Sequence, residues 1–397
     1  MKTLDPISLG NVELKNRIIR SATYEGRCDS KGTPDDSYYA YYENIARHNA
    51  GAIITGFAYT SEEGRAMQYQ QAGIESEDKI SFFTELTRRI HQYDCPVFMQ
   101  ISHAGRQTTK ARAGGRTVSA SNSRSLYFRT SPRSLSTEEV YEKIHEYALA
   151  AKRAMEAGFD GVQIHAAHGY LVHQFLLPVT NKRKDEFGLD ATDKIGTRFL
   201  EEIIISARKL CGERFPILVK VSGGIDLKPG FDAGQFTALI KFLDKMKVDG
   251  IEISYGTMDH ALNIIRGGFP TDLIMRVNPF FRNGKSMWNG VNHLILKYYK
   301  YRRHAFSRRY NLQYARRAKS HTNIPIISVG GFRDLHEIND AIEGNQTDIV
   351  GLSRPFICEP DLCSKMIKNS SWASRCINCN HCAVMCDSGK PTKCYQY

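Results

Sequence analysis

The sequence predicts an α/β protein with the fold of a (β/α)8 TIM barrel, and three observations favour this class. Eight short apolar segments recur along the chain between residues 17 and 354. Segments with the period of amphipathic helices separate most of them. Glycines follow the last two apolar segments, where barrels of this type hold phosphate groups. No stretch rich in proline, glycine or serine divides the 397 residues, so we expect one barrel at 1–365 and a short cysteine-rich segment at 366–397.

The predicted strands and helices alternate along the chain, as a parallel barrel requires. Each predicted strand is a run of mainly apolar residues, which is typical of strands buried on both faces. The strands are expected at 17–21, 51–56, 96–101, 161–164, 216–222, 250–254, 324–331 and 347–354. Helical patterns lie at 38–49, 80–93, 141–158, 198–210 and 236–245.

Titratable side chains gather at the carboxyl end of the fourth predicted strand. His165, His168 and Tyr170 follow the apolar run 161–164, and this end of a strand faces the ligand in parallel α/β proteins. A single histidine there is usually structural, whereas three such side chains within six residues indicate a pocket. Two imidazole N–H groups can hold an oxygen that becomes an enolate, and a phenol can protonate the neighbouring carbon.

The run 156–188 resembles the signature of the Old Yellow Enzyme family of FMN-dependent ene-reductases. It contains HAAHGYL, QFLLP, Asn181, Arg183, Asp185 and Gly188 in that order. The resemblance implies an FMN-dependent oxidoreductase that reduces the C=C bond of a small α,β-unsaturated carbonyl compound, with electrons from NAD(P)H or a protein donor. His165 and His168 would hold the carbonyl oxygen, flavin N5 would give hydride to the β-carbon, and Tyr170 would protonate the α-carbon.

The same resemblance implies which residues surround the flavin ring. The backbone of Ala22 and Thr23 would lie against the ring, Gly56 would approach it, and the amide of Gln100 in the run QISHAGR would bond to the pyrimidine edge. Lys220 would place a cation near flavin N1 and O2, where relatives usually carry arginine.

A phosphate site is expected after the seventh and eighth strands. Gly330 and Gly331 end the seventh strand, and Ser353 and Arg354 end the eighth. Glycines at these places expose backbone N–H groups, and a nearby arginine completes a cradle for a phosphate. This pattern supports a phosphorylated cofactor independently of the histidine motif, and it matches where the family holds the FMN phosphate.

Five of the ten cysteines lie in the last 22 residues, which indicates a metal or cluster site in a reducing compartment. Cys376, Cys379, Cys382 and Cys394 have the spacing of a 4Fe-4S site, with Cys386 as an extra cysteine. The segment also resembles the one that follows the flavin barrel in dienoyl-CoA reductases and trimethylamine dehydrogenase. Tetrahedral zinc can use the same four sulfurs, so the spacing leaves both metals open.

The basic surplus of the chain is local. The formal net charge is +12, and an insertion expected at about 267–320, after the sixth strand, carries most of that surplus. It has no recognisable nucleic-acid motif, and a solvated amphipathic helix or a docking surface for an acidic ferredoxin or flavodoxin both fit it. The N-terminus has no apolar signal-peptide core, and no apolar run reaches the length of a membrane span, so we expect a cytoplasmic protein.

Two further functions remain open on the sequence. An iron-sulfur flavoprotein could oxidise an amine and pass electrons singly through the cluster, although such relatives carry cysteine where this chain has Tyr24. An electron-transfer subunit could instead dock an acidic partner through the basic insertion. The sequence does not select the physiological substrate, the electron donor or a homo-oligomer.

Overall fold

The computed structural model describes residues 2–281 and 286–397, and it confirms the predicted barrel. Eight parallel strands form a closed ring, because β13 pairs with β3 and β4 pairs with β6. The strands of the ring are β3 (Ile18–Arg20), β4 (Ala52–Ile54), β6 (Val97–Ser102), β9 (Gly161–Ala166), β10 (Ile217–Ser222), β11 (Gly250–Ser254), β12 (Ile326–Val329) and β13 (Ile349–Leu352). Each lies within or beside the run predicted for it.

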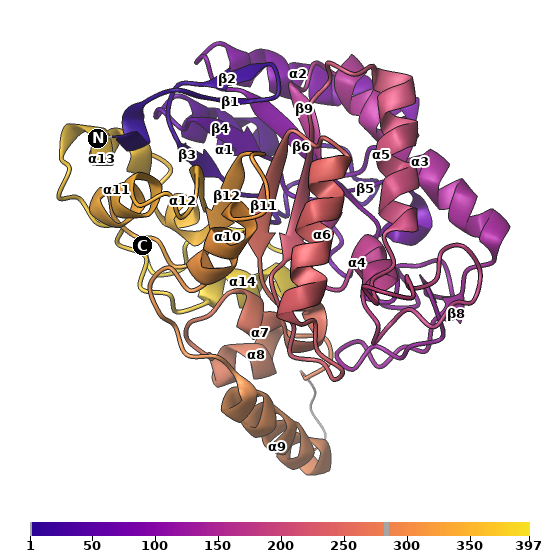
Figure 1. Cartoon of the computed structure of the whole chain (residues 1–397). Helices are drawn as coiled ribbons and strands as arrows, with labels where there is room; N and C mark the ends of the chain where they lie inside the picture. Colours follow the sequence, from indigo (N-terminus) through magenta and orange to yellow (C-terminus); the bar gives the residue numbers. More distant parts are fainter. Residues whose placement is uncertain (1, 282–285) are drawn as a thin grey trace.

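Helices cover the outside of the ring (Figure 1). Their inner faces carry apolar residues at helical spacing, as Phe83, Leu86 and Ile90 show for α2. Capping boxes start two of them: Ser136 and Glu139 form one on α3, and Asp232 does so with Gln235 on α6. The covering helices are α1 (Asp36–Ala46), α2 (Ile80–His91), α3 (Thr137–Glu156), α5 (Arg198–Cys211), α6 (Ala233–Lys245), α10 (Leu312–Lys319), α11 (Leu335–Glu343), α12 (Arg354–Cys358) and α13 (Leu362–Lys368).

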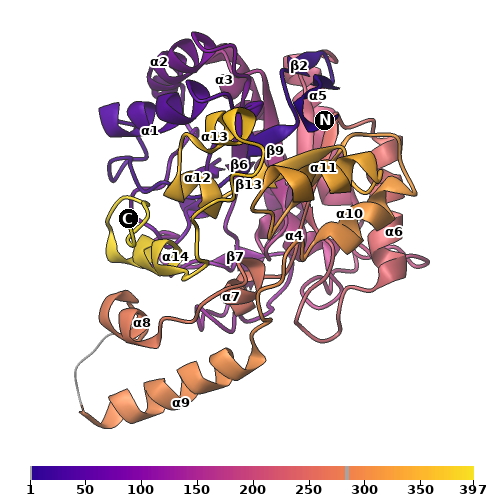
Figure 2. The same cartoon turned by 90° about the vertical axis from the view of Figure 1, so that its left-hand side faces the viewer.

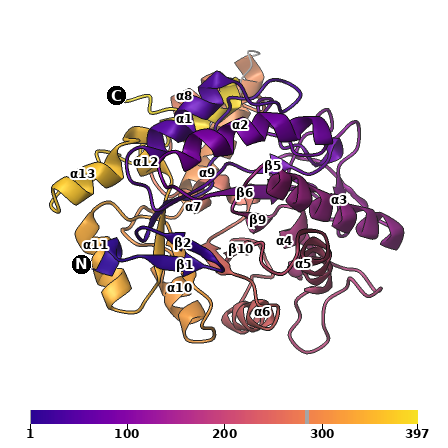
Figure 3. The same cartoon turned by 90° about the horizontal axis from the view of Figure 1, so that it is seen from above.

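The amino end of the ring is closed by a hairpin of β1 (Ile7–Leu9) and β2 (Val12–Leu14), which lies across the strands when the molecule is seen from above (Figure 3). Leu9 and Leu14 are fully buried there against Phe98 and Leu218. This apolar plug leaves the carboxyl ends of the strands as the open end of the barrel.

Short elements and the C-terminal tail lie at the open end. Helices α8 and α9 project below the ring in Figures 1 and 2, and α14 lies beside α8. The elements outside the ring and its helices are β5 (Ala58–Tyr59), β7 (Val118–Ser119), β8 (Arg133–Ser134), α4 (Leu171–Leu176), α7 (Ala261–Ile264), α8 (Thr271–Val277), α9 (Ser286–Arg302) and α14 (His381–Met385), with short 3-10 turns between them.

The basic segment 267–320 has two parts in the structure. Leu312, Ala315 and Ala318 of α10 are buried, because this helix is the regular barrel helix between β11 and β12. Helix α9 instead exposes Leu294, Tyr298 and Tyr301. Within the described residues, no helix has both the length and the apolar character needed to cross a membrane.

Candidate functional site

A cavity of about 310 Å3 lies at the carboxyl ends of the strands. Most of the residues predicted to bind substrate or cofactor line it together, although they come from six different strands or the loops that follow them. They are Ala22, Thr23, Gln100, His165, His168, Tyr170, Lys220, Gly330, Gly331, Ser353 and Arg354.

Gly56 is the exception, since it does not line the cavity. Its backbone N–H donates to Glu25 Oε1 at 2.6 Å and to the Tyr42 hydroxyl at 2.8 Å. A Cβ at this position would lie 2.3 Å from the Glu25 carboxylate. The glycine predicted to approach the flavin thus lies outside the cavity, against a buried carboxylate.

His165, His168 and Tyr170 form one cluster in the cavity. The His165 ring centroid lies 4.9 Å from that of His168 and 4.9 Å from that of Tyr170. The Nε2 atom of His168 lies 2.8 Å from Ser254 Oγ at the end of β11. The Nδ1 atom of His165 is buried without a hydrogen-bond partner among the described residues, so it is free to bind a ligand.

Burial sets the protonation states of this cluster. Burial and the positive charge of Lys220 hold the pKa of His165 well below its ordinary range, and burial together with His165 does the same for the pKa of His168. Burial raises the pKa of the Tyr170 phenol. At neutral pH the site therefore presents two neutral imidazoles and a protonated phenol.

Polar side chains inside the ring form a second network beneath the cavity. Gln100 Nε2 donates to Gln163 Oε1 at 2.6 Å, and Gln163 Nε2 donates to Glu252 Oε2 at 2.8 Å. The fully buried Glu252 also pairs with Lys220 Nζ at 3.1 Å and accepts from Ser21 Oγ. This pairing compensates the Lys220 charge. Sequence reasoning missed Gln163 and Glu252, although a polar residue inside a buried strand is a signal that could have found them.

The other end of the cavity holds two buried arginines. Arg354 and Arg333 are 7% and 5% exposed, and neither guanidinium lies within 4.0 Å of a carboxylate oxygen in the described part of the chain. Burial and repulsion from Arg354 lower the pKa of Arg333 to about 10. Gly330 and Gly331 lie beside them at φ of 131° and 90°, where other residues are strained. Two buried cations next to glycine backbone form a cradle that fits a phosphate.

Arg333 was missed by sequence reasoning. It follows the glycine pair by two residues, and that short spacing after the seventh strand was the available signal. Tyr24 and Phe57 also line the cavity, and the Phe57 ring lies 5.4 Å from that of Tyr170. Phe57 therefore shapes the same wall of the cavity as the predicted proton donor.

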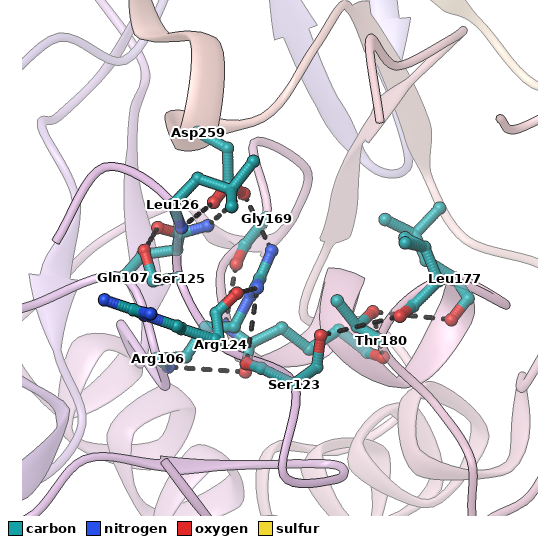
Figure 4. A network of polar contacts seen from close by, with 12 residues as sticks. Arg106, Gln107, Ser123, Arg124, Ser125, Leu126, Gly169, Leu177, Thr180 and Asp259 are labelled. Carbon is teal, nitrogen blue, oxygen red and sulfur yellow. Dashed lines mark hydrogen bonds and ion pairs between the residues drawn. The ribbon is translucent and has the colours of Figure 1, made fainter. Parts of the chain in front are cut away.

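A buried ion pair holds the rim of the cavity in place (Figure 4). Arg106 and Gln107 both donate to Asp259 Oδ2 at 2.7 Å, and the Leu126 N–H donates to Asp259 Oδ1 at 2.8 Å. Asp259 lies next to Met258, whose N–H donates to the His168 carbonyl at 2.8 Å. The network thus connects the loop after β6 to the backbone of His168.

The predicted metal ligands meet at a separate small cavity. Cys376, Cys379, Cys382 and Cys394 line it together with Cys358 from α12. Cys386 lines the large cavity instead, and Cys382 lines both. Among the described residues, no three His, Cys, Asp or Glu side chains are arranged so that they could hold a metal ion. The predicted thiols are neighbours, but the coordination geometry predicted from their spacing is not formed.

Comparisons with known proteins identify the family. Residues 2–290 match the NADH:flavin oxidoreductase / NADH oxidase family. The chain is 34% identical over 272 residues to an NADPH dehydrogenase of Bacillus subtilis, covering 67% of this chain and 77% of that protein. It is 26% identical to a cinnamate reductase of Clostridium sporogenes, covering 94% of this chain but only 54% of the relative.

A solved structure supports the fold. An old yellow enzyme homologue from Zymomonas mobilis is 22% identical, has a TM-score of 0.73 and covers 96% of both chains. At this identity the likeness concerns the barrel alone, whereas the family match rests on the sequence. The chain therefore belongs to the NADH:flavin oxidoreductase / NADH oxidase family, which includes the Old Yellow Enzymes, and it is an FMN-dependent NAD(P)H oxidoreductase.

Proposed function

We propose that this oxidoreductase reduces the C=C bond of an α,β-unsaturated carbonyl compound. The observation that carries the proposal is the cluster of two neutral imidazoles and one protonated phenol in a single cavity. These groups match the needs of the reaction, in which a carbonyl oxygen gains negative charge and the neighbouring carbon takes a proton.

We propose that the cofactor occupies the same cavity. We assign the backbone of Ala22 and Thr23 and the amide of Gln100 to the flavin ring, with Lys220 on its electron-rich edge. The phosphate is assigned to the cradle of Gly330, Gly331, Ser353, Arg354 and Arg333. When bound, FMN supplies the hydride that adds to the β-carbon.

The protein's own groups would act on the substrate oxygen and on the α-carbon. His165 and His168 are neutral, so each has one N–H that can donate to the carbonyl oxygen, and the free Nδ1 edge of His165 is available for this role. Their hydrogen bonds would stabilise the enolate oxygen as charge develops. Tyr170 would give its phenolic proton to the α-carbon and recover a proton from solvent between turnovers.

The body of the substrate would meet an apolar wall. Leu262, Ile264, Phe269, Ile274 and Phe281 line the cavity. This lining favours a substrate with a sizeable apolar part next to the unsaturated carbonyl group. The family relative named cinnamate reductase supports this substrate class.

The Tyr170→Phe variant tests the assignment. We expect alkene reduction to slow by about 100-fold or more, because proton donation is lost. Reduction of the bound flavin by NADPH should change by less than about twofold, because no proton from Tyr170 is used in that half-reaction. Rapid-mixing absorbance measurements separate the two half-reactions.

Tyr147→Phe is the matched control, since Tyr147 is a fully buried tyrosine on α3 that does not line the cavity. It should leave both half-reactions unchanged. Equal slowing of both half-reactions in Tyr170→Phe would contradict the role of Tyr170.

We further propose that Cys376, Cys379, Cys382 and Cys394 hold a 4Fe-4S cluster, with zinc as the alternative. Their spacing and their shared cavity support the proposal. Iron and acid-labile sulfide assayed on anaerobically purified protein should give about four of each per chain. Stoichiometric zinc without iron would select the alternative. Protein that contains neither iron nor zinc would refute a metal role for the tail.

A further inference from the structure

Two asparagines of the cysteine segment contact the arginines of the phosphate cradle. Asn378 and Asn380 stand on either side of Cys379. The Asn378 side-chain oxygen accepts from Arg333 Nη2, and the Asn380 Oδ1 atom accepts from Arg354 Nη1 at 2.5 Å. The segment predicted to hold a metal thus also touches both guanidiniums that face the large cavity.

The asparagines are themselves fixed in position. Both adopt the left-handed backbone conformation, with φ of 58° for Asn378 and 64° for Asn380, and asparagine tolerates this region better than most residues. The Asn378 carbonyl accepts from Gly268 N–H at 2.7 Å, and Asn380 Nδ2 donates to the Gly268 carbonyl at 3.0 Å. A Cβ at Gly268 would lie 2.8 Å from the Cys379 carbonyl oxygen, so the backbone at Gly268 is in close contact with the backbone of the cysteine segment.

The partners of the arginines explain why these contacts matter. A guanidinium held only by neutral oxygens keeps its full charge for an anion, whereas a carboxylate partner would neutralise it. The second amino group of Arg354 donates to the Arg266 carbonyl at 2.9 Å, and Arg333 Nη1 donates to its neighbour's carbonyl at 2.6 Å. Among the described residues, every hydrogen-bond partner of these two guanidiniums is therefore a neutral oxygen.

We propose that Asn378 and Asn380 are positioning residues which aim Arg333 and Arg354 at the FMN phosphate, so that the cysteine segment acts as a clamp on the cofactor. The inference rests on the proposed placement of that phosphate. It gives the tail a role in cofactor retention that does not depend on electron transfer.

The test compares FMN with riboflavin, which carries the same ring without the phosphate. Asn378→Gly and Asn380→Gly remove the side chains and keep the backbone conformation, because glycine adopts positive φ without strain. Each variant should weaken FMN binding by about tenfold through loss of a hydrogen bond to a charged group. Riboflavin binding should change by less than about twofold, since it does not use the arginines.

Dissociation constants of both flavins are measured by fluorescence quenching with the flavin-free full chain. Asn345→Gly is the matched control, because Asn345 is an exposed asparagine at φ 52° that does not line the large cavity. It should leave both constants unchanged. Unchanged riboflavin affinity also shows that a variant is folded around the ring site.

Two variants of the cradle separate failure of this inference from failure of the phosphate placement. If Arg333→Gln and Arg354→Gln weaken FMN selectively while the asparagine variants do not, the clamp is refuted and the placement stands. If none of the four changes the ratio of FMN to riboflavin affinity, the placement is refuted together with the clamp. Equal weakening of both flavins by the asparagine variants also overturns the clamp, because it indicates general loosening.

Discussion

The two ends of the large cavity handle charge in opposite ways. At the end that carries His165 and His168, Lys220 is paired with the buried Glu252 inside the barrel, and the two histidines are neutral. At the other end, Arg333 and Arg354 are buried without a carboxylate partner in the described residues. Burying charge is expensive unless it is compensated. The charge of Lys220 is thus compensated within the protein, whereas the two arginines lack an anionic partner there, as the proposed phosphate site requires.

The largest predicted effect concerns the neutral histidines. Burial and Arg106 lower the pKa of His173 to about 3, and the pKa values of His165 and His168 are also lowered. Below the ordinary histidine pKa of about 6.5, the unfolded chain binds more protons than the folded one, so stability falls as the pH falls. Each histidine contributes a slope of up to about 1.4 kcal/mol per pH unit, which makes about 4 kcal/mol per unit for three.

Chemical denaturation between pH 7.5 and pH 5 measures this slope in the flavin-free protein. The His173→Asn variant should reduce it by about 1.4 kcal/mol per pH unit. Above about pH 6.5 these histidines should add no slope, because both states are then neutral. A stability that does not change between pH 7 and pH 5 would show that the folded protein holds these buried imidazoles protonated.

A second prediction concerns the unpaired cations. The double variant Arg333→Gln/Arg354→Gln should weaken FMN binding by about 100-fold or more, because two charge-assisted hydrogen bonds to the phosphate are lost. Without an anion the same variant should be more stable than the parent protein, since two uncompensated buried charges have been removed. Thermal unfolding with and without FMN reports both effects. A variant less stable in both conditions would mean that the arginines serve the fold.

The smallest predicted effect concerns the paired lysine. Glu252→Gln removes the carboxylate that compensates Lys220, so the reduced, anionic flavin should be stabilised and the midpoint potential should rise by about 30 mV. A spectroelectrochemical titration measures it. Glu359→Gln is the control, because Glu359 is also buried, but its partners Lys365 and Arg375, unlike Lys220, do not line the large cavity. A lowered potential in Glu252→Gln would contradict the proposed position of Lys220 beside the flavin.

The sequence predicted the barrel because its signals are local. Continuous apolar runs mark strands buried on both faces, and glycines mark where they end, so the eight strands could be placed without knowing their neighbours. His165, His168 and Tyr170 share one strand end, which is why one motif brought them together. The spacing of the tail grouped four cysteines that line one small cavity, but it did not predict that Cys358 of α12 joins them.

The contacts that pair or position the charged side chains of the cavity could not be predicted in the same way. The pairing of Lys220 with Glu252 depends on the register of adjacent strands, and the contact between Arg333 and Asn378 spans 45 residues. Gly56 shows a related difficulty. The sequence indicates that a glycine permits close approach, but it does not identify the group that lies against it. There the neighbour is the carboxylate of Glu25.

An anaerobic single-turnover experiment tests the central claim most directly. The flavin is first reduced with one equivalent of NADPH, the protein is mixed with cinnamaldehyde or 2-cyclohexenone, and flavin absorbance and product are followed together. We expect the oxidised flavin spectrum to return as the saturated carbonyl compound forms in equal amount, and Tyr170→Phe to slow this return. A flavin that stays reduced with both enones, together with an oxidised flavin that is reduced by amines, would contradict the proposal.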